Sequence, residues 1–279
     1  MKNRHVLGEA VRHLILIILA LYTLAPLLFL FVNAFKSNNE IIASPVALPE
    51  HWTLQYITTA LEAINFGKAL GLTFIITFFS ILLLVIVSSF AAWAMVRSKT
   101  ILSNIVFLCF TAAMLVPFQS LMYPLLSVFE KMGLKNVQGL ILMYGGFGLS
   151  MSVFLYHGFI KSVPASLEEA AVLDGANLFQ MFFKVVFPLL KGTTVTVIVL
   201  NGMWIWNDYL LPFLVIGNKT GSKTLTLELY FAKLTSGQYG NPWELIFPAV
   251  FVTIIPIIIL YIFLQKYIVA GVSEGAVKM

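Results

Sequence analysis

Residues 163–188 read VPASLEEAAVLDGANLFQMFFKVVFP. Ser166 followed by Glu169 is typical of a capping box, which predicts a helix that begins at Leu167. The dipeptide Asp-Gly at 174–175 predicts the end of that helix, because glycine readily adopts the left-handed conformation of a helix exit. This part of the stretch is therefore expected to be a short helix closed by a tight turn.

A second helix is expected directly after the turn. Asn177 followed by Gln180 is another capping pattern, and the residues after it continue without a helix breaker as far as Pro188. The whole stretch is thus predicted to be a helix, a glycine turn and a second helix.

The composition indicates a membrane environment for the rest of the chain. Of 279 residues, 60% are hydrophobic and 10% are charged, and the mean hydropathy is +0.95. Soluble domains are about 45–50% apolar and about 25% charged. A water-soluble fold cannot bury this much apolar surface, which excludes a soluble enzyme, a nucleic-acid-binding domain and a disordered chain. We expect an integral membrane protein.

Net charge and cysteine usage are less informative. The chain carries a net charge of +5, but Lys and Arg of a membrane protein gather on the cytoplasmic side, so their positions matter more than their total. The single cysteine, Cys109, lies in an apolar run, and one thiol cannot form an internal disulfide. We expect it to be a packing residue.

Stretches without Asp, Glu, Lys or Arg mark the expected membrane spans, since a transmembrane helix needs about 20 mostly apolar residues. Six spans are expected, at about 14–35, 70–96, 101–127, 137–160, 192–216 and 245–265. The first run exceeds the about 7–15 apolar residues of a signal peptide, and no small-residue cleavage site follows Phe35, so we expect it to be retained. Pro117 and Pro124 predict kinks in the third span.

Six spans place both ends of the chain on one side of the membrane. With the ends inside, ten Lys and Arg residues fall in internal segments and seven in external ones, and three of the ten precede the first span. This bias predicts that both termini are cytoplasmic. The expected organisation is a cytoplasmic N-terminus, 1–12, and a single six-helix transmembrane domain, 13–279. Its internal loop is 161–191, and its longer external segments are 37–67 and 219–243.

The internal loop has two interpretations on its own residues. Ala170 and Ala171 present small side chains beside the charge of Glu169. Such a helix suits docking into the groove of a partner protein, where a basic residue would meet the carboxylate. The alternative is a surface helix that lies along the membrane.

The spacing in this loop resembles a family pattern. The tripeptide Glu-Ala-Ala at 169–171 is followed by Gly175, Val185, Phe187 and Pro188. This arrangement is similar to the EAA loop of ABC-transporter permeases, E-A-A-x3-G-x9-I-x-L-P. The two departures, Val for Ile and Phe for Leu, keep both positions apolar.

Three shorter motifs extend the resemblance. Asp-Gly-Ala at 174–176 matches the frequent D-G-A form, and Trp-Asn-Asp at 206–208 is similar to the W-N-[DE] of sugar permeases. The tail GVSEGAVK at 271–278 is similar to the G-x-x-x-G-A-V-K ending of the maltose-type, MalG-like subunit. The chain is identified as a member of the carbohydrate-type ABC importer permeases, the binding-protein-dependent transport inner-membrane components.

This resemblance implies an all-α polytopic membrane protein with the six-helix, MetI-like fold of type I ABC importer permeases, in the bacterial cytoplasmic (inner) membrane. It implies as partners a second homologous permease subunit, two ATPase subunits and an extracytoplasmic sugar-binding protein, besides the lipid bilayer, and no nucleic acid. ATP and Mg²⁺ would be bound by the ATPase, so neither a cofactor nor enzymatic activity is expected in this chain. In agreement, the stretch GNKTGSKT at 217–224 has Ser222 where a phosphate-binding loop has glycine before its lysine.

Carried over residue by residue, the resemblance assigns ATPase coupling to the EAA loop. ATP-driven closure of the ATPases would move this loop and bias the permease between inward-open and outward-open states. The residues concerned are Glu169, Ala170, Ala171, Asp174, Gly175 and Pro188.

Asp208 is the acidic residue expected inside a span, where a charge at the helix centre costs roughly 2.5–3.5 kcal/mol. It follows Gly192 by 16 residues, about 24 Å along a helix, and so lies near the outer edge of a core about 30 Å thick. Structural pairing and a role in the translocation path both remain open. Trp204 and Asn207 suit either a sugar or an interfacial aromatic belt, and Gln119 suits either the path or an interhelical hydrogen bond.

An ion-gradient-driven secondary carrier is the alternative function. Such carriers place ionisable residues near the bilayer midplane and show repeat symmetry, and this sequence has neither apart from Asp208 near an edge. A scaffold without a transport role would leave the EAA loop unexplained.

The histidines have no metal-ligand spacing. In the importer interpretation, the segment 217–243 is expected to contact the binding protein.

Overall fold

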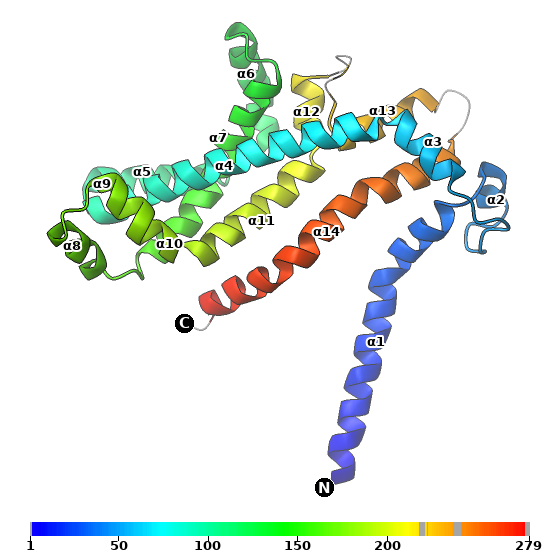
Figure 1. Ribbon diagram of the computed structural model, residues 1–279, viewed down its shortest axis with the longest axis horizontal. Coiled ribbons are helices and arrows are strands. Elements are labelled where there is room, and N and C mark those ends of the chain that lie inside the picture. Colours follow the sequence, from blue (N-terminus) through cyan, green and yellow to red (C-terminus); the bar gives the residue numbers. More distant parts are fainter. Residues whose placement is uncertain (1, 218–220, 222, 237–240, 277–279) are drawn as a thin grey trace. The chain divides into compact units, whose positions relative to one another are not determined.

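The computed structural model describes residues 2–217, 221, 223–236 and 241–276, and within these ranges the chain forms helices and loops without a strand (Figure 1). Parts of the expected external segment, 218–220, 222 and 237–240, lie outside the described residues, as do Val277 and Lys278 of the C-terminal motif. The chain divides into two compact units, Met1–Gly67 with Glu228–Pro256 and Lys68–Leu227 with Ile257–Met279. The helices outside the internal loop are α1 (Lys2–Asn33), α2 (Asn38–Ala43), α3 (Gln55–Ala63), α4 (Phe66–Ser98), α5 (Ile101–Ala113), α6 (Phe118–Lys131), α7 (Val137–Ile160), α11 (Lys191–Asn207), α12 (Leu210–Val215), α13 (Leu225–Ser236) and α14 (Trp243–Ala276).

Four of the described helices are long and apolar enough to cross a membrane. They are Val11–Asn33 of α1, all of α4, all of α7, and Trp243–Phe263 of α14. Two bent pairs also meet this test, α5 with α6 at 106° and Leu178–Leu189 with α11 at 77°. The described chain thus has four candidate spans, or up to six if each bent pair is one span. The all-helical membrane class expected from the apolar runs and from the family resemblance is confirmed.

The stretch 101–127, expected as one span, is not a continuous helix. α5 ends at Ala113 and α6 begins at Phe118, with Pro117 as its extended N-cap. Proline has no N–H to donate, and it disfavours helical backbone in the residue before it. Pro117 therefore accounts for a break here, whereas Pro124 lies within α6.

The expected fifth span, 192–216, is also interrupted. α11 ends at Asn207 and α12 begins at Leu210, with Asp208 in an extended conformation between them (φ −74°, ψ 131°). The motif aspartate therefore occupies a helix break.

In the first unit, the segment after α1 is tied down by hydrogen bonds. Ser37 and Glu40 form a reciprocal capping box at the start of α2. The N–H of Ser37, the N–H of Glu50 and the Ser37 hydroxyl donate to the Glu40 carboxylate and lower its pKa. The Lys36 ammonium donates to the Ser44 carbonyl at 3.0 Å, and burial lowers the pKa of Lys36.

The same unit has its own small core. Ala60 of α3 and Ile64, the C-cap residue of the same helix, pack with Val252 of α14. At the start of α14, Glu244 accepts a hydrogen bond from the Asn38 N–H at 3.0 Å. Segments about two hundred residues apart in the sequence are thereby joined.

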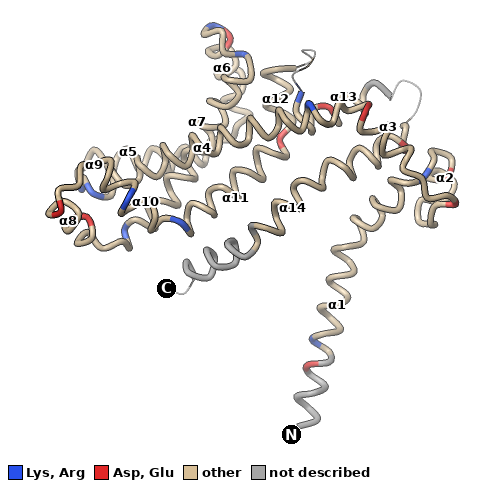
Figure 2. Tube along the Cα trace, in the orientation of Figure 1, with Lys and Arg blue, Asp and Glu red and all other residues tan. Residues whose placement is uncertain are grey.

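In the second unit, α4, α7 and α11 approach closely around Gly148. A Cβ on Gly148 would come within 2.5 Å of Asn201 Oδ1 on α11 and 2.7 Å of Leu84 Cδ1 on α4, so a larger residue there would require these side chains to move. Asn201 Nδ2 donates to Ser152 Oγ of α7 at 3.1 Å. Figure 2 shows α4 and α11 without charged residues between their ends, as membrane-embedded helices require.

Candidate functional site

The first half of the internal loop forms α8, Ser166–Leu173. This helix begins one residue earlier than expected, and the predicted capping box between Ser166 and Glu169 is wrong: the N-cap is Ala165, without a side-chain hydrogen bond. The N–H groups of Glu168 and Glu169 both donate to the Ala165 carbonyl, at 2.9 and 3.1 Å. The helix backbone therefore already uses the donor that the Ser166 hydroxyl would need.

The predicted end of this helix at Gly175 is confirmed. Gly175 has φ +80°, in the left-handed region. The N–H of Ala176 donates to the Ala171 carbonyl at 2.9 Å, and that of Gly175 donates to the Val172 carbonyl at 3.0 Å. This pair of hydrogen bonds is the Schellman motif, which satisfies the last carbonyls of a helix and favours glycine at this position.

The second predicted capping box is also confirmed. Asn177 Oδ1 accepts from the Gln180 N–H at 2.9 Å, and Gln180 Oε1 accepts from the Asn177 N–H at 3.1 Å. The helix that follows is α9 (Leu178–Gln180), continued by the segment η1 and by α10 (Phe187–Leu189).

The segment η1, Met181–Val186, is a π-helix rather than an α-helix. Pro188 cannot donate to the Lys184 carbonyl, and its ring crowds that carbonyl, so the turn before it widens. In agreement, the Phe187 N–H donates to the Phe182 carbonyl, five residues back. The motif proline thus shapes the loop from inside the helix.

The widened segment anchors the loop in the second unit. Phe182 and Val186 are fully buried in a core with Trp93 of α4 and with Tyr156 and Ile160 of α7. Burying such side chains contributes roughly 1.5–3 kcal/mol each. The second half of the loop is therefore packed against α4 and α7 through buried apolar side chains.

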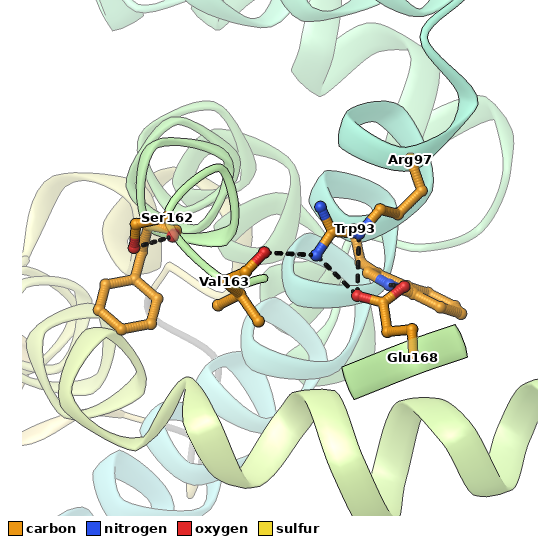
Figure 3. A network of polar contacts seen from close by, with 6 residues as sticks. Trp93, Arg97, Ser162, Val163 and Glu168 are labelled. Carbon is orange, nitrogen blue, oxygen red and sulfur yellow. Dashed lines mark hydrogen bonds and ion pairs between the residues drawn. The ribbon is translucent and has the colours of Figure 1, made fainter. Parts of the chain in front are cut away.

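Glu168, which sequence reasoning did not single out, ties α8 to α4 (Figure 3). Its Oε1 accepts from Arg97 Nη2 at 2.7 Å and from Arg97 Nε at 2.8 Å, and its Oε2 accepts from Trp93 Nε1 at 3.1 Å. Arg97 Nη2 also donates to the Val163 carbonyl at 3.0 Å. We call these four residues the α4–α8 clamp. Its charges are mostly buried, with the Glu168 side chain 10% exposed and the Arg97 side chain 23%.

Most motif residues of α8 and its exit turn instead point to solvent. Leu173 is 89% exposed and Val172 is 58% exposed, although both are apolar, while Ala171 is buried against the molecule. Exposed apolar side chains beside carboxylates are typical of a surface that another protein covers. We call this surface the α8 outer face. It consists of Glu169, Ala170, Val172, Leu173, Asp174 and Gly175.

Asp208, at the break between α11 and α12, is held by three hydrogen bonds. Its Oδ2 accepts from the Tyr144 hydroxyl at 2.9 Å, and its Oδ1 accepts from the Leu210 N–H at 2.9 Å. Its backbone carbonyl accepts from the Thr226 hydroxyl at 2.7 Å. The structure thus supplies the pairing that was one of the two interpretations of this residue, and leaves a role in the path untested.

The other path candidates differ in their relation to Asp208. Trp204 packs edge-on against Tyr144, with ring centroids 5.4 Å apart. Asn207 is exposed, and its amide donates to the Met203 carbonyl at 2.8 Å. Gln119 is exposed near the start of α6, and within the described residues no hydrogen bond or ring contact joins it to this group. Trp204 and Asp208 meet through Tyr144, whereas Gln119 stands apart.

Three buried polar atoms in the same unit have no hydrogen-bond partner among the described residues. They are Thr77 Oγ1 and Ser80 Oγ of α4 and Trp206 Nε1 of α11. An unsatisfied buried group costs about 1–3 kcal/mol, so each invites a water molecule or a ligand hydroxyl. Sequence reasoning missed the two hydroxyls because Ser and Thr are common in membrane helices and usually bond to their own backbone.

Comparison with known proteins places these features within one family match. The family described as "Binding-protein-dependent transport system inner membrane component" matches residues 85–274. This range includes the α4–α8 clamp, the α8 outer face and Asp208.

Relatives and a solved structure match nearly the whole chain. The probable starch degradation products transport system permease protein AmyC of Thermoanaerobacterium thermosulfurigenes is 43% identical, over 94% of both chains. The multiple sugar-binding transport system permease protein MsmG of Streptococcus mutans is 34% identical over 100% of both. The melibiose/raffinose/stachyose import permease protein MelC of Bacillus subtilis is 33% identical over 91% of both. The fold is similar to that of a bacterial ABC transporter involved in the import of the acidic polysaccharide alginate, with a TM-score of 0.83 and 22% identity over 96% of this chain and 98% of that one.

Proposed function

Because the chain belongs to the family of binding-protein-dependent transport system inner membrane components, we propose that it is a permease subunit of an ATP-driven sugar importer. The observation that carries this proposal is the family match through residues 85–274, which contain the EAA loop. The family consists of transporter permeases rather than enzymes. The chain is therefore a multi-pass inner-membrane protein whose partners include an ATPase and a substrate-binding protein.

We propose that the transported substrate is an oligosaccharide and that the transporter is a heteromeric assembly. The relatives are named for starch degradation products, for multiple sugars, and for melibiose, raffinose and stachyose. The assembly would contain a second homologous permease, two ATPase subunits that bind ATP and Mg²⁺, and an extracytoplasmic sugar-binding protein. This chain would line half of the path.

The α8 outer face is the proposed docking surface for the ATPase. Its exposed Leu173 and Val172 offer apolar contact, and Glu169 and Asp174 offer charge. When the ATPases close, α8 would move with them, and the α4–α8 clamp would carry that movement into α4. Because packed helices switch between discrete arrangements, this movement would bias the path between its two open states.

The proposed path residues lie on α4, α6 and α11 and at the α11–α12 break. A sugar offers hydroxyls to polar groups and CH faces to aromatic rings. The unpaired Thr77, Ser80 and Trp206 suit the hydroxyls. Trp204, Asn207, Asp208 and Gln119 remain the candidates that the sequence indicated.

In the proposed orientation both termini and α8 are cytoplasmic, and the segment 37–67 is extracytoplasmic. This follows the excess of Lys and Arg on the inner side. The alternative of an ion-gradient-driven carrier receives no support from the comparisons, in which the relatives are named as transport-system or import permeases.

Two highly exposed positions allow a direct test. Leu173 lies on α8 and is 89% exposed, and Val46 lies in the segment 37–67 and is 81% exposed. In a Cys109→Ser background, a membrane-impermeant maleimide should label Val46→Cys in intact cells or spheroplasts, and Leu173→Cys only after permeabilisation. Leu173→Cys should also cross-link to a copurifying P-loop ATPase, whereas Val46→Cys should not.

Mass spectrometry of the complex purified in mild detergent should identify that ATPase and a second EAA-bearing permease. Reconstituted with a sugar-binding protein, the complex should hydrolyse ATP faster when the sugar is added. Recovery of this chain alone, transporting sugar in liposomes without ATP, would overturn the importer function.

A further inference from the structure

A polar pocket of about 560 Å³ lies beside the α4–α8 clamp, at the C-terminal ends of α4 and α7. It is lined by the last turn of α4, the α4–α5 connection, the first turns of α5, the end of α7 and the segment before α8. Arg97 and Val163 of the clamp belong to this lining, whereas the α8 outer face and the candidate path residues do not. The pocket therefore calls for a separate explanation.

The lining of this pocket is strongly one-sided in charge. Arg97, Lys99 and Lys161 contribute cations, and His157 contributes an imidazole. Among the residues that line it, all of which the structure describes, there is no Asp or Glu. Glu168 neutralises Arg97 at the clamp, so Lys99 and Lys161 remain as the cations of the lining without an ion pair among the described residues. A cationic hollow of this kind favours an oxyanion.

The neighbouring side chains hold the pocket in shape. The His157 ring stacks on Phe107 of α5 with centroids 3.6 Å apart, and Lys161 Nζ lies 5.9 Å from the centre of the same ring. Lys99 has φ +49°, a left-handed backbone conformation in the tight turn between α4 and α5. Asn104 adds a neutral amide from α5.

The length of α7 would place this pocket at the depth of the lipid headgroups. α7 has 24 residues, a rise of about 36 Å, which exceeds a hydrocarbon core of about 30 Å and falls short of the about 40–45 Å that includes the headgroups. His157 and Lys161, at the end of this helix, would therefore lie among lipid phosphates.

An apolar surface adjoins the pocket and suits acyl chains. Ile101, Ile105 and Leu108 are 81%, 51% and 65% exposed and follow one side of α5, the helix that also carries Asn104. A free phosphate ion would use only the cations. A phospholipid would use both features, with its phosphate in the pocket and its chains along α5.

We propose that this pocket binds the phosphate of an anionic phospholipid, such as phosphatidylglycerol, with Lys99 and Lys161 as its main ligands. Basic pockets between the cytoplasmic ends of membrane helices are suited to such headgroups. The inference rests on the orientation proposed above, which makes this end cytoplasmic. Because Arg97 lines the pocket and also belongs to the clamp, a bound lipid would sit directly against the proposed coupling element.

Native mass spectrometry of the assembled transporter tests this proposal. The complex is titrated in detergent with phosphatidylglycerol, with phosphatidylcholine, and with inorganic phosphate as a competitor. Wild type should retain phosphatidylglycerol in preference to phosphatidylcholine, and millimolar phosphate should not displace it. Lys99→Gln with Lys161→Gln should weaken this binding by about 10-fold or more, and Lys99→Arg with Lys161→Arg should preserve it.

The matched control is Lys68→Gln with Lys131→Gln, which removes the same charge from exposed positions at the other ends of α4 and α6. This control variant should bind phosphatidylglycerol with an affinity within 2-fold of that of wild type. Equal binding by wild type and by the Lys99/Lys161 glutamine variant would overturn the proposal, as would displacement of phosphatidylglycerol by phosphate. Sugar-stimulated ATPase activity, measured in parallel, tests the importer function separately.

Discussion

The internal loop and the α11–α12 break each contain an acidic motif, and the structure uses the two acids in opposite ways. On α8, Glu169 is exposed, while its neighbour Glu168 is buried in the clamp with Arg97. At the break, Asp208 itself accepts hydrogen bonds from Tyr144 and Leu210. In the first motif the acid is thus exposed, and the adjacent residue makes the structural contact. In the second motif the acid itself accepts hydrogen bonds within the fold.

Reversing the charge of Glu168 should have the largest effect on stability. Glu168→Lys places a cation against Arg97 and leaves Trp93 Nε1 without its acceptor, and breaking one side of a buried ion pair costs about 3–5 kcal/mol. Thermal unfolding of the purified complex should show a clear loss of stability, and sugar-stimulated ATPase activity should fall. Arg97→Glu combined with Glu168→Arg should recover part of both. An unfolding midpoint like that of wild type would mean that the clamp does not hold α8.

Removing Asp208 should have the next largest effect. Asp208→Ala leaves the Tyr144 hydroxyl and the Leu210 N–H unpaired, which costs about 1–3 kcal/mol. Asp208→Asn keeps an acceptor and should lose less. The neighbouring Asn207→Ala, which removes an exposed side chain, serves as the control for the unfolding measurement. If Asp208→Ala unfolded like wild type but changed the sugar concentration for half-maximal transport, Asp208 would serve the path rather than the fold.

These two acids also mark how far the sequence could predict the site. Local rules found Gly175 and the Asn177–Gln180 box because each depends on residues a few positions apart. No local rule connects Arg97 with Glu168, 71 residues later, so the clamp required the tertiary structure. The Ser166 cap failed for a similar reason, since its sequence pattern says nothing about which carbonyl the first N–H groups of the helix reach. Within the membrane, the apolar runs indicated where helices form, but the breaks at Pro117 and Asp208 also depend on backbone and tertiary hydrogen bonds.

A smaller loss of stability is expected on substitution of Gly175, where only the backbone conformation favours glycine. At Gly175 a Cβ would meet no atom within 4 Å, so the penalty comes from the left-handed backbone itself. Gly175→Ala should therefore cost about 1 kcal/mol, and Gly175→Asn less, because asparagine tolerates this conformation better. Unfolding midpoints of the two variants give the comparison. Alanine and asparagine variants of equal stability would contradict the assignment of strain to φ.

The smallest effect on stability, and the sharpest contrast with Glu168, is expected at Glu169. Among the described residues its carboxylate forms no hydrogen bond or ion pair: it is exposed, and the helix uses only its backbone N–H. Glu169→Lys should therefore unfold like wild type and still reach the membrane, yet fail to recover the ATPase in a pull-down or to show sugar-stimulated ATP hydrolysis. Ser166→Lys is the matched control: Ser166 is also exposed and lies on the same helix, and the substitution adds charge without altering the Glu-Ala-Ala motif. If both lysine variants coupled normally, the exposed acid would not be the contact with the ATPase. If Glu169→Lys instead unfolded as readily as Glu168→Lys, the division of labour between the two neighbouring acids would be wrong.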